Sequence, residues 1–107
     1  MIFVQGVRRV MLAPLLRQLI DGARAERRHL EVDAPERQFY LGVEAAAQGL
    51  LHPEVGAHRR SDWLEREKPE YRDGYLSALA DLTAALTADA PPVVLPLPRY
   101  SGKTMSP

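Results

Sequence analysis

The positions of the prolines constrain the fold of this chain more than any other feature. Four prolines stand alone, at positions 14, 35, 53 and 69, and the other five fall within residues 91–107. Proline lacks a backbone N–H and its ring clashes with the preceding turn, so it suits the first turn of a helix and interrupts a helix elsewhere. These positions predict helices that begin near Pro14, Pro35 and Pro69, and no helix beyond residue 90.

Apolar residues recur at helical spacing around the helix starts predicted near Pro14 and Pro35. In the segment Val7–Leu30 they repeat every fourth residue on two adjacent rows. We expect this helix to begin near Pro14, with Met1–Leu12 as a short strand or an irregular lead-in. A second helix should begin with Asp33 as its N-cap and end near Leu51. Its expected buried stripe is Phe39, Val43, Ala47 and Leu50, flanked by Tyr40 and Leu51.

Two further helices are expected in the second half of the chain. A short one should start at Ser61 or Asp62 and end at Lys68, because Asp62 with Glu65 three residues later matches a capping box. The proline that follows ends it and opens a fourth helix, which should run to about Ala88. The expected buried stripe of the fourth helix is Tyr71, Tyr75, Leu79, Leu82 and Leu86.

Together these segments predict a mainly α fold. We expect a small bundle of three to four helices with a short extended N-terminus and a proline-rich extended C-terminal tail. The helical domain should comprise residues 1–89 and the tail residues 90–107. Short connections favour antiparallel neighbours. With 107 residues and no cysteine, the chain fits one domain without disulfides or thiolate metal sites.

Charged residues interrupt the apolar stretches near the N-terminus. Arg17 follows Leu16 directly, and Asp21 comes four residues later. No apolar run therefore reaches the roughly 18 residues of a membrane-spanning helix, and the pattern does not match a signal peptide. We expect no membrane association and a cytoplasmic location.

Few residues are arranged as catalytic or metal-binding groups usually are. His52, Glu54 and His58 are the one cluster of possible metal ligands, but a proline and a glycine separate them and no helix face aligns them. The Gly-Lys-Thr at 102–104 lacks the earlier glycine of a phosphate-binding loop. No serine lies in a motif that would activate it. We therefore expect neither an enzyme nor a bound metal or cofactor.

Small residues share one face of the second helix. Gly42, Ala45, Ala46 and Gly49 follow one another at helical spacing. Small side chains let two helix backbones approach closely, either within one chain or between two copies. Gly42, Ala46 and Gly49 are therefore candidate contacts for self-association.

The tail is more apolar than an ordinary linker. A disordered tail should be polar, whereas Val93, Val94, Leu95 and Leu97 are interspersed only with prolines. Prolines also reduce the entropy that an extended chain loses on docking. We expect Val93–Leu97 to lie in an apolar groove, on its own helices or on a partner protein.

Charge is balanced overall but unevenly distributed. Residues 1–30 carry +4, from six arginines against two acids, and residues 61–90 carry −4, from seven acids against three bases. These regions either attract each other, present solvated faces, or supply a basic face for phosphate. In the last case the candidate nucleic-acid contacts are Arg17, Arg24, Arg28, Arg59 and Arg60.

The remaining candidate site residues are aromatic. Tyr40, Tyr71, Tyr75 and Trp63 are expected in the core, and an exposed Trp63 beside Arg59 would instead mark a binding site. The sequence thus predicts a small non-enzymatic protein-interaction or regulatory module that binds another protein or itself through helix faces and the tail. The alternative is a nucleic-acid-binding regulator that uses the basic face of the first helix.

Overall fold

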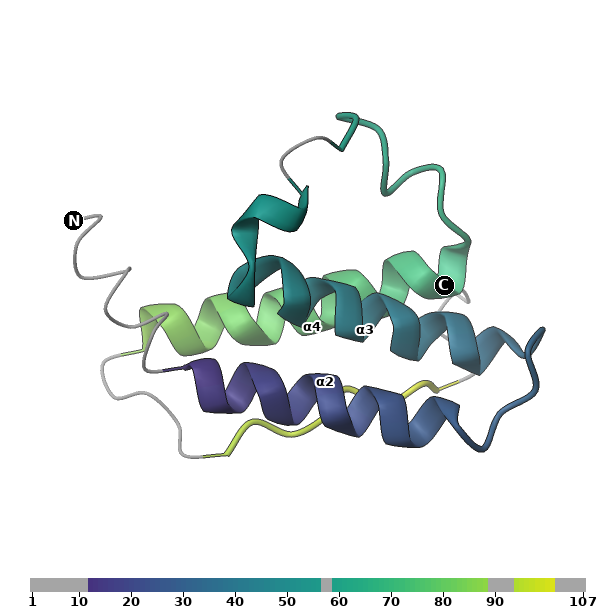
Figure 1. The fold of residues 1–107 in the computed structure, drawn as a ribbon, viewed down its shortest axis with the longest axis horizontal. Helices are drawn as coiled ribbons and strands as arrows, with labels where there is room; N and C mark the ends of the chain where they lie inside the picture. The colour runs from purple at the N-terminus through teal and green to yellow at the C-terminus, as the bar shows by residue number, and fades with distance from the viewer. Residues whose placement is uncertain (1–11, 57–58, 89–93, 102–107) are drawn as a thin grey trace.

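The chain is mainly helical. The computed structural model describes residues 12–56, 59–88 and 94–101, and these ranges contain three α-helices and no strand (Figure 1). The short strand or lead-in expected over Met1–Leu12 lies outside them, apart from Leu12. The helices are α2 (Ala13–Arg27), α3 (Pro35–Leu51) and α4 (Pro69–Thr87), with a 3₁₀ helix η1 (Pro53–Gly56) after α3.

Each α-helix has a proline in its first turn, so the predicted starts near Pro14, Pro35 and Pro69 are confirmed. The expected N-cap of α3 is wrong by one residue. Ala34 occupies the cap instead of Asp33 and offers no side-chain hydrogen bond. Pro35 explains the shift, because the residue before a proline is pushed into extended backbone, and Ala34 has a ψ of 134°.

The short helix expected between Ser61 and Lys68 is also wrong. Residues 61–66 form consecutive turns, in which the Trp63 N–H donates to the Arg60 carbonyl oxygen at 3.1 Å. The Asp62 carboxylate pairs with two arginine side chains, with Arg60 Nε at 3.3 Å and Arg66 Nε at 3.5 Å. A segment this short cannot offset the cost of helix nucleation unless packing or capping supports it.

The three helices differ in direction. α2 runs antiparallel to α3, and a short turn joins them (Figure 1). In contrast, α3 and α4 run parallel: Phe39 lies beside Gly74, and further along both helices Ala47 shares a core cluster with Leu82. The antiparallel arrangement expected from short connections therefore holds for the first pair only. A parallel pair needs a return connection, and residues 52–56 and 59–68, which we call the arch, are its described part.

The backbones of α3 and α4 meet at two glycines. A Cβ atom added to Gly42 would overlap the Tyr71 carbonyl oxygen and lie 2.8 Å from Tyr75 N. A Cβ added to Gly74 would overlap the Phe39 carbonyl oxygen. No other residue type fits at either position without moving the helices apart. Gly42 therefore makes its close contact within the chain, where a second copy cannot reach it.

The buried face of α4 is smaller than its sequence stripe suggests. Its fully buried residues are Gly74, Ala78, Leu82 and Ala85. Of the expected stripe only Leu82 belongs to this set, and the large side chains on either side are half-buried. The close approach of the backbones explains the difference, since it leaves room for small residues at the centre and directs large ones to the flanks.

Large side chains of α2 close the core from the other side. Leu16, Leu19 and Ile20 pack with Ala47 of α3 and Leu82 of α4. The buried residues of α2 are Leu15, Leu16, Leu19, Ile20 and Ala23, which confirms the predicted periodicity of the described part of this helix.

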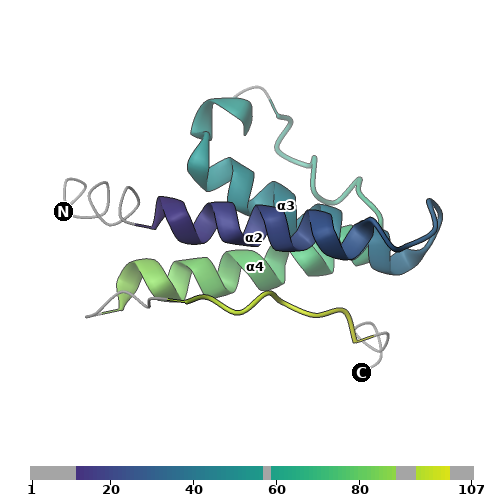
Figure 2. The same cartoon turned by 60° about the horizontal axis from the view of Figure 1, so that its bottom comes forward.

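The described part of the tail lies against the same helices. Residues 94–101 are extended and run alongside α2 and α4 (Figure 2). Leu95 and Leu97 pack against the core clusters, and Leu97 lies over Gly22 of α2. The Tyr100 ring meets Phe39 edge-on at a centroid distance of 5.7 Å. Val94 remains 67% exposed, and Val93 lies outside the described residues.

The two glycines of α3 should respond in opposite ways to substitution by alanine. Gly42→Ala should lower the free energy of unfolding by at least about 2 kcal/mol, because its Cβ meets the α4 backbone. Gly49→Ala should raise it by up to about 1 kcal/mol, because nothing lies within 4 Å of that Cβ and alanine favours helix. Urea denaturation measures both changes. Similar effects at the two positions would contradict the close contact between the α3 and α4 backbones at Gly42.

The tail should contribute to stability through its half-buried leucines. Leu97→Ala should lower the free energy of unfolding by about 1–2 kcal/mol, since the side chain leaves its contact with the core. Val94→Ala is the matched control, and this exposed position should change stability by less than about 0.5 kcal/mol. Equal melting temperatures for Leu97→Ala and the unmodified chain would mean that the tail does not dock.

Candidate functional site

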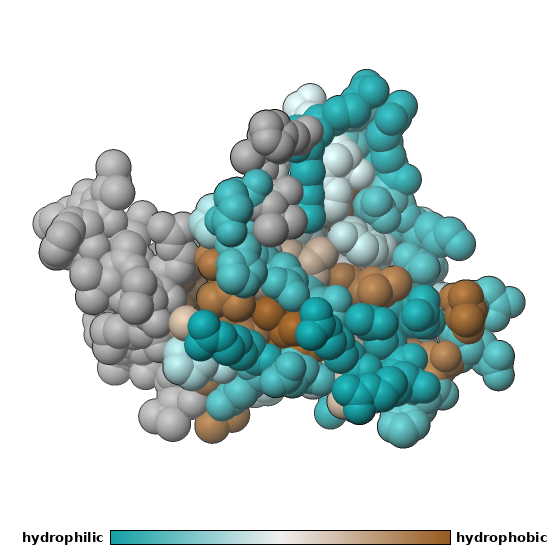
Figure 3. All heavy atoms as spheres, viewed as in Figure 1, coloured by the Kyte–Doolittle hydropathy of each residue, from teal (hydrophilic) through white to brown (hydrophobic). Residues whose placement is uncertain are grey.

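A pocket lies beneath the arch. It encloses about 410 Å³ and is formed by α3, η1, the following loop and α4. Figure 3 shows the arch projecting above the helices, with paler, less hydrophilic atoms on its inner side. The lining residues of this arch pocket are Ala46, Gly49, Leu50, Pro53, Gly56, Arg59, Trp63, Tyr75 and Leu79.

The floor of the arch pocket comes from the side of the α3–α4 pair. Ala46 and Gly49 contribute almost no side-chain volume, and Leu50 and Leu79 are half-buried. A Cβ placed on Gly49 would meet no atom within 4 Å. The floor is thus apolar. The arch, which connects the two parallel helices, passes above it.

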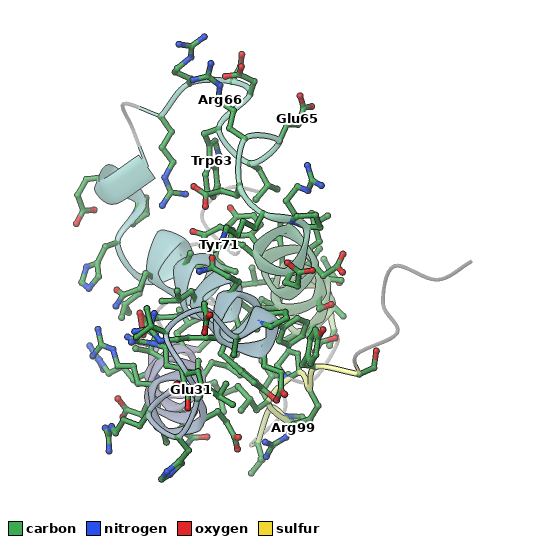
Figure 4. The ribbon with its side chains drawn as sticks, turned by 90° about the vertical axis from the view of Figure 1, so that its right-hand side faces the viewer. Glu31, Trp63, Glu65, Arg66, Tyr71 and Arg99 are labelled. Atoms are coloured by element: carbon green, nitrogen blue, oxygen red, sulfur yellow. The ribbon has the colours of Figure 1, made fainter. Side chains whose placement is uncertain are left out.

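Three aromatic rings stand together between the arch and α4. Trp63 meets Tyr75 at a centroid distance of 5.1 Å and Tyr71 at 6.2 Å, both nearly perpendicular. Such edge-to-face pairs stabilise a cluster beyond the area that they bury. Figure 4 shows Trp63 on the arch, above Tyr71 of α4.

These aromatic residues are less buried than the sequence suggests. Only Tyr40 belongs to the fully buried core, whereas Trp63, Tyr71 and Tyr75 are half-buried. Tyr75 nevertheless packs against the core cluster that contains Phe39, so its expected core position is confirmed in part. The expected core position of Trp63 and Tyr71 is wrong. Trp63 lies on the arch, away from the helices, so its ring lines the pocket and does not enter the core.

Arg59 supplies the charge of the arch pocket. Its guanidinium carbon lies 3.9 Å from the centre of the Trp63 ring, which is a cation–π contact. Its side chain makes no hydrogen bond or ion pair with a residue that the structure describes. Among the residues that line the pocket, Arg59 alone carries a full charge.

Polar contacts hold the outer part of the arch. Asp62 pairs with Arg60 and Arg66, and Arg72 of α4 donates a hydrogen bond to the Glu65 carbonyl oxygen at 3.0 Å. Each of these exposed contacts contributes roughly 0–1 kcal/mol. Together they position the loop that carries Trp63; Figure 4 labels Glu65 and Arg66 above Trp63 in this loop.

The protein-contact residues inferred from the sequence occupy different places. Gly42 is buried between α3 and α4, and Ala46 is also a core residue, although it borders the arch pocket. Gly49 lines the pocket. Leu95 and Leu97 lie against the core of their own chain. The small face of α3 is therefore divided between internal packing and the pocket.

The arginines inferred as nucleic-acid contacts do not share one surface. Arg24 donates to Glu44 of α3 at 2.8 Å. Arg17 on α2 and Arg28 at its C-cap are exposed and pair with no described residue. Arg59 and Arg60 lie on the arch, which Figures 1 and 4 place on the opposite side of α3 from α2. Arg59 instead joins the pocket that the sequence did not reveal.

The possible metal ligands do not converge in the part of the chain that is described. His52 Nδ1 lies 3.6 Å from Glu54 Oε1, and both side chains are exposed. His58 and the Gly-Lys-Thr at 102–104 lie outside the described residues. No group of three potential ligands occurs among the residues that the structure describes.

No protein-family model matches this chain, and no curated protein or solved structure is significantly similar to it. Over the described ranges, none of the helices combines the length and the apolar character needed to cross a membrane. The chemistry of the arch pocket is therefore the basis for a functional proposal.

The Tyr71 hydroxyl should make stability depend on alkaline pH. Burial raises the pKa of Tyr71 above its ordinary value of 10.0, Glu67 raises this pKa further, and Arg59 opposes the shift. Because the folded chain keeps this proton to a higher pH than the unfolded chain, the free energy of unfolding should fall as the pH rises above 10. Tyr71→Phe should weaken this fall without changing stability near neutral pH. Urea denaturation across the alkaline range measures the difference, and identical slopes would contradict the assignment.

Proposed function

We propose that this chain is a small non-enzymatic interaction module, of a regulatory kind, and that it binds a partner protein in the arch pocket. The observation that carries the proposal is the half-buried Trp63, held with Arg59 and Tyr75 around an apolar floor. Tryptophan, tyrosine and arginine are the residues that most often dominate binding energy at protein interfaces. An apolar concavity with a few polar groups is also the usual form of a ligand site.

Most of the other described residues expected to bind partners are occupied within the chain, although Val94 is exposed. Gly42 packs against the α4 backbone, and Leu95 and Leu97 cover their own core. This occupancy favours the arch pocket over the helix faces and the tail as the contact with a partner. It also argues against self-association through the whole small face of α3.

The lining of the arch pocket favours binding over catalysis. Its ionisable residues are Arg59 and Tyr75. Arginine stays protonated at all ordinary pH values, so it cannot act as a general base. Tyr75 is thus the one lining side chain that could act as a nucleophile or base, and it lacks a second ionisable group in the lining that would activate it.

A nucleic-acid-binding regulator is the second candidate. Arg17 on α2 and Arg28 at its C-cap favour it, because both are exposed and have no ion-pair partner among the described residues. Two observations weaken it: Arg24 is engaged by Glu44, and Asp21 is also exposed on α2. A carboxylate among the arginines reduces the attraction to phosphate.

Affinity capture from host lysate, with and without nuclease, tests the proposal against its alternative. Gly49→Leu should fill the arch pocket without displacing the backbone, since a Cβ there meets nothing within 4 Å. Ala25→Leu is the matched control, because Ala25 is exposed on α2, away from the pocket. We expect a protein that resists nuclease and is retained by the unmodified chain and Ala25→Leu, but lost with Gly49→Leu.

Two results would overturn the proposal. Equal retention by Gly49→Leu would place the contact elsewhere on the molecule. Recovery that disappears with nuclease would favour the nucleic-acid-binding alternative. Melting temperatures of the three proteins show that each remains folded.

A further inference from the structure

We infer that the arch pocket recognises an apolar group that carries a carboxylate, and that the Arg59 guanidinium binds this carboxylate. The ligand that combines the two in a protein is a C-terminal apolar residue, whose side chain enters the pocket while its free carboxylate meets Arg59. This inference rests on the proposed function and names the feature of the partner that is bound.

The apolar half of the ligand follows from the shape of the arch pocket. Leu50 and Leu79 border a floor made of Ala46 and Gly49, and the Trp63 ring stands above it. A volume of about 410 Å³ lies near the lower end of the range for ligand pockets. Such a space has room for one branched or aromatic side chain together with the terminal backbone that carries the carboxylate.

The anionic half follows from Arg59. Its guanidinium carbon lies 3.9 Å from the centre of the Trp63 ring. A contact with a ring face uses none of the guanidinium N–H groups as a conventional hydrogen-bond donor. These donors have no described partner, and no acidic residue lines the pocket. A carboxylate matches the forked geometry of a guanidinium and forms the stronger, charge-assisted type of hydrogen bond.

Other ligand classes fit less well. Aromatic clusters such as Trp63 with Tyr71 and Tyr75 can bind ammonium groups, but here Arg59 already covers the Trp63 ring and would repel a second cation. A neutral apolar group would cover the Arg59 donors without supplying an acceptor, which costs binding free energy. An apolar anion matches both the apolar floor of the pocket and the charge of Arg59.

Trp63 reports occupancy directly, because it is the single tryptophan of the chain and lines the pocket. The probe is the peptide Gly-Ser-Gly-Ser-Leu with a free C-terminus, titrated against the full chain while tryptophan fluorescence is recorded. The same peptide with a C-terminal amide differs only at that terminus, where a neutral amide replaces the carboxylate. We expect the free acid to bind about tenfold or more tightly than the amide.

Substitutions then assign the preference to one side chain. Arg59→Gln should remove the difference between acid and amide, and Arg59→Lys should restore part of it, because lysine keeps the charge but loses the fork. Arg60→Gln is the matched control: this neighbouring arginine pairs with Asp62 outside the pocket and should leave the preference intact.

Each contrary outcome has a distinct meaning. Equal binding of acid and amide would overturn the role of Arg59 while leaving the arch pocket as a protein-binding site. If N-acetyl-leucine bound as tightly as the peptide, the ligand would be a small carboxylic acid. That result would overturn the inference that the pocket binds the C-terminus of a protein. Failure of both peptides at millimolar concentration would overturn the inference, and the capture experiment with Gly49→Leu would then decide the proposed function separately.

Discussion

The contact between the backbones of α3 and α4 is the constraint on which the rest of the structure depends. It requires glycine at positions 42 and 74, since a Cβ at either one would overlap a carbonyl oxygen of the other helix. Because the two helices run parallel, the chain between them must return along their length. That return is the arch, and the arch pocket exists because the arch crosses a face made of small residues.

The remaining elements complete a core that small residues alone could not fill. α2 contributes leucines and an isoleucine, and the tail adds Leu95 and Leu97 along its edge. Ion pairs between Arg24 and Glu44, and between Arg99 and Glu26, link α2 to α3 and to the tail. These exposed pairs align the elements, while burial of apolar area supplies most of the stability.

The sequence predicts local features of this fold better than its global arrangement. Proline positions located the helix starts, and periodicity located the buried residues of α2 and most of those of α3, because both signals act within a few residues. The parallel direction of α3 and α4 leaves no comparable local signal. The buried face of α4 was misjudged because large residues look more buried than Gly74 and Ala78 when the close approach is unknown. The arch pocket was missed because Ala46, Arg59 and Tyr75 come from separate segments.

The contact between α3 and α4 also corresponds to a short sequence pattern by which related chains could be recognised. Gly42 and Ala46 on α3 are matched by Gly74 and Ala78 on α4, so each helix carries a glycine followed four residues later by an alanine. The two pairs lie at the contact between the helices. A Cβ added at either glycine meets backbone atoms of the other helix, so a smaller side chain in that helix could not make room for it. A chain with this architecture can therefore vary its exposed faces, but both glycines must persist together.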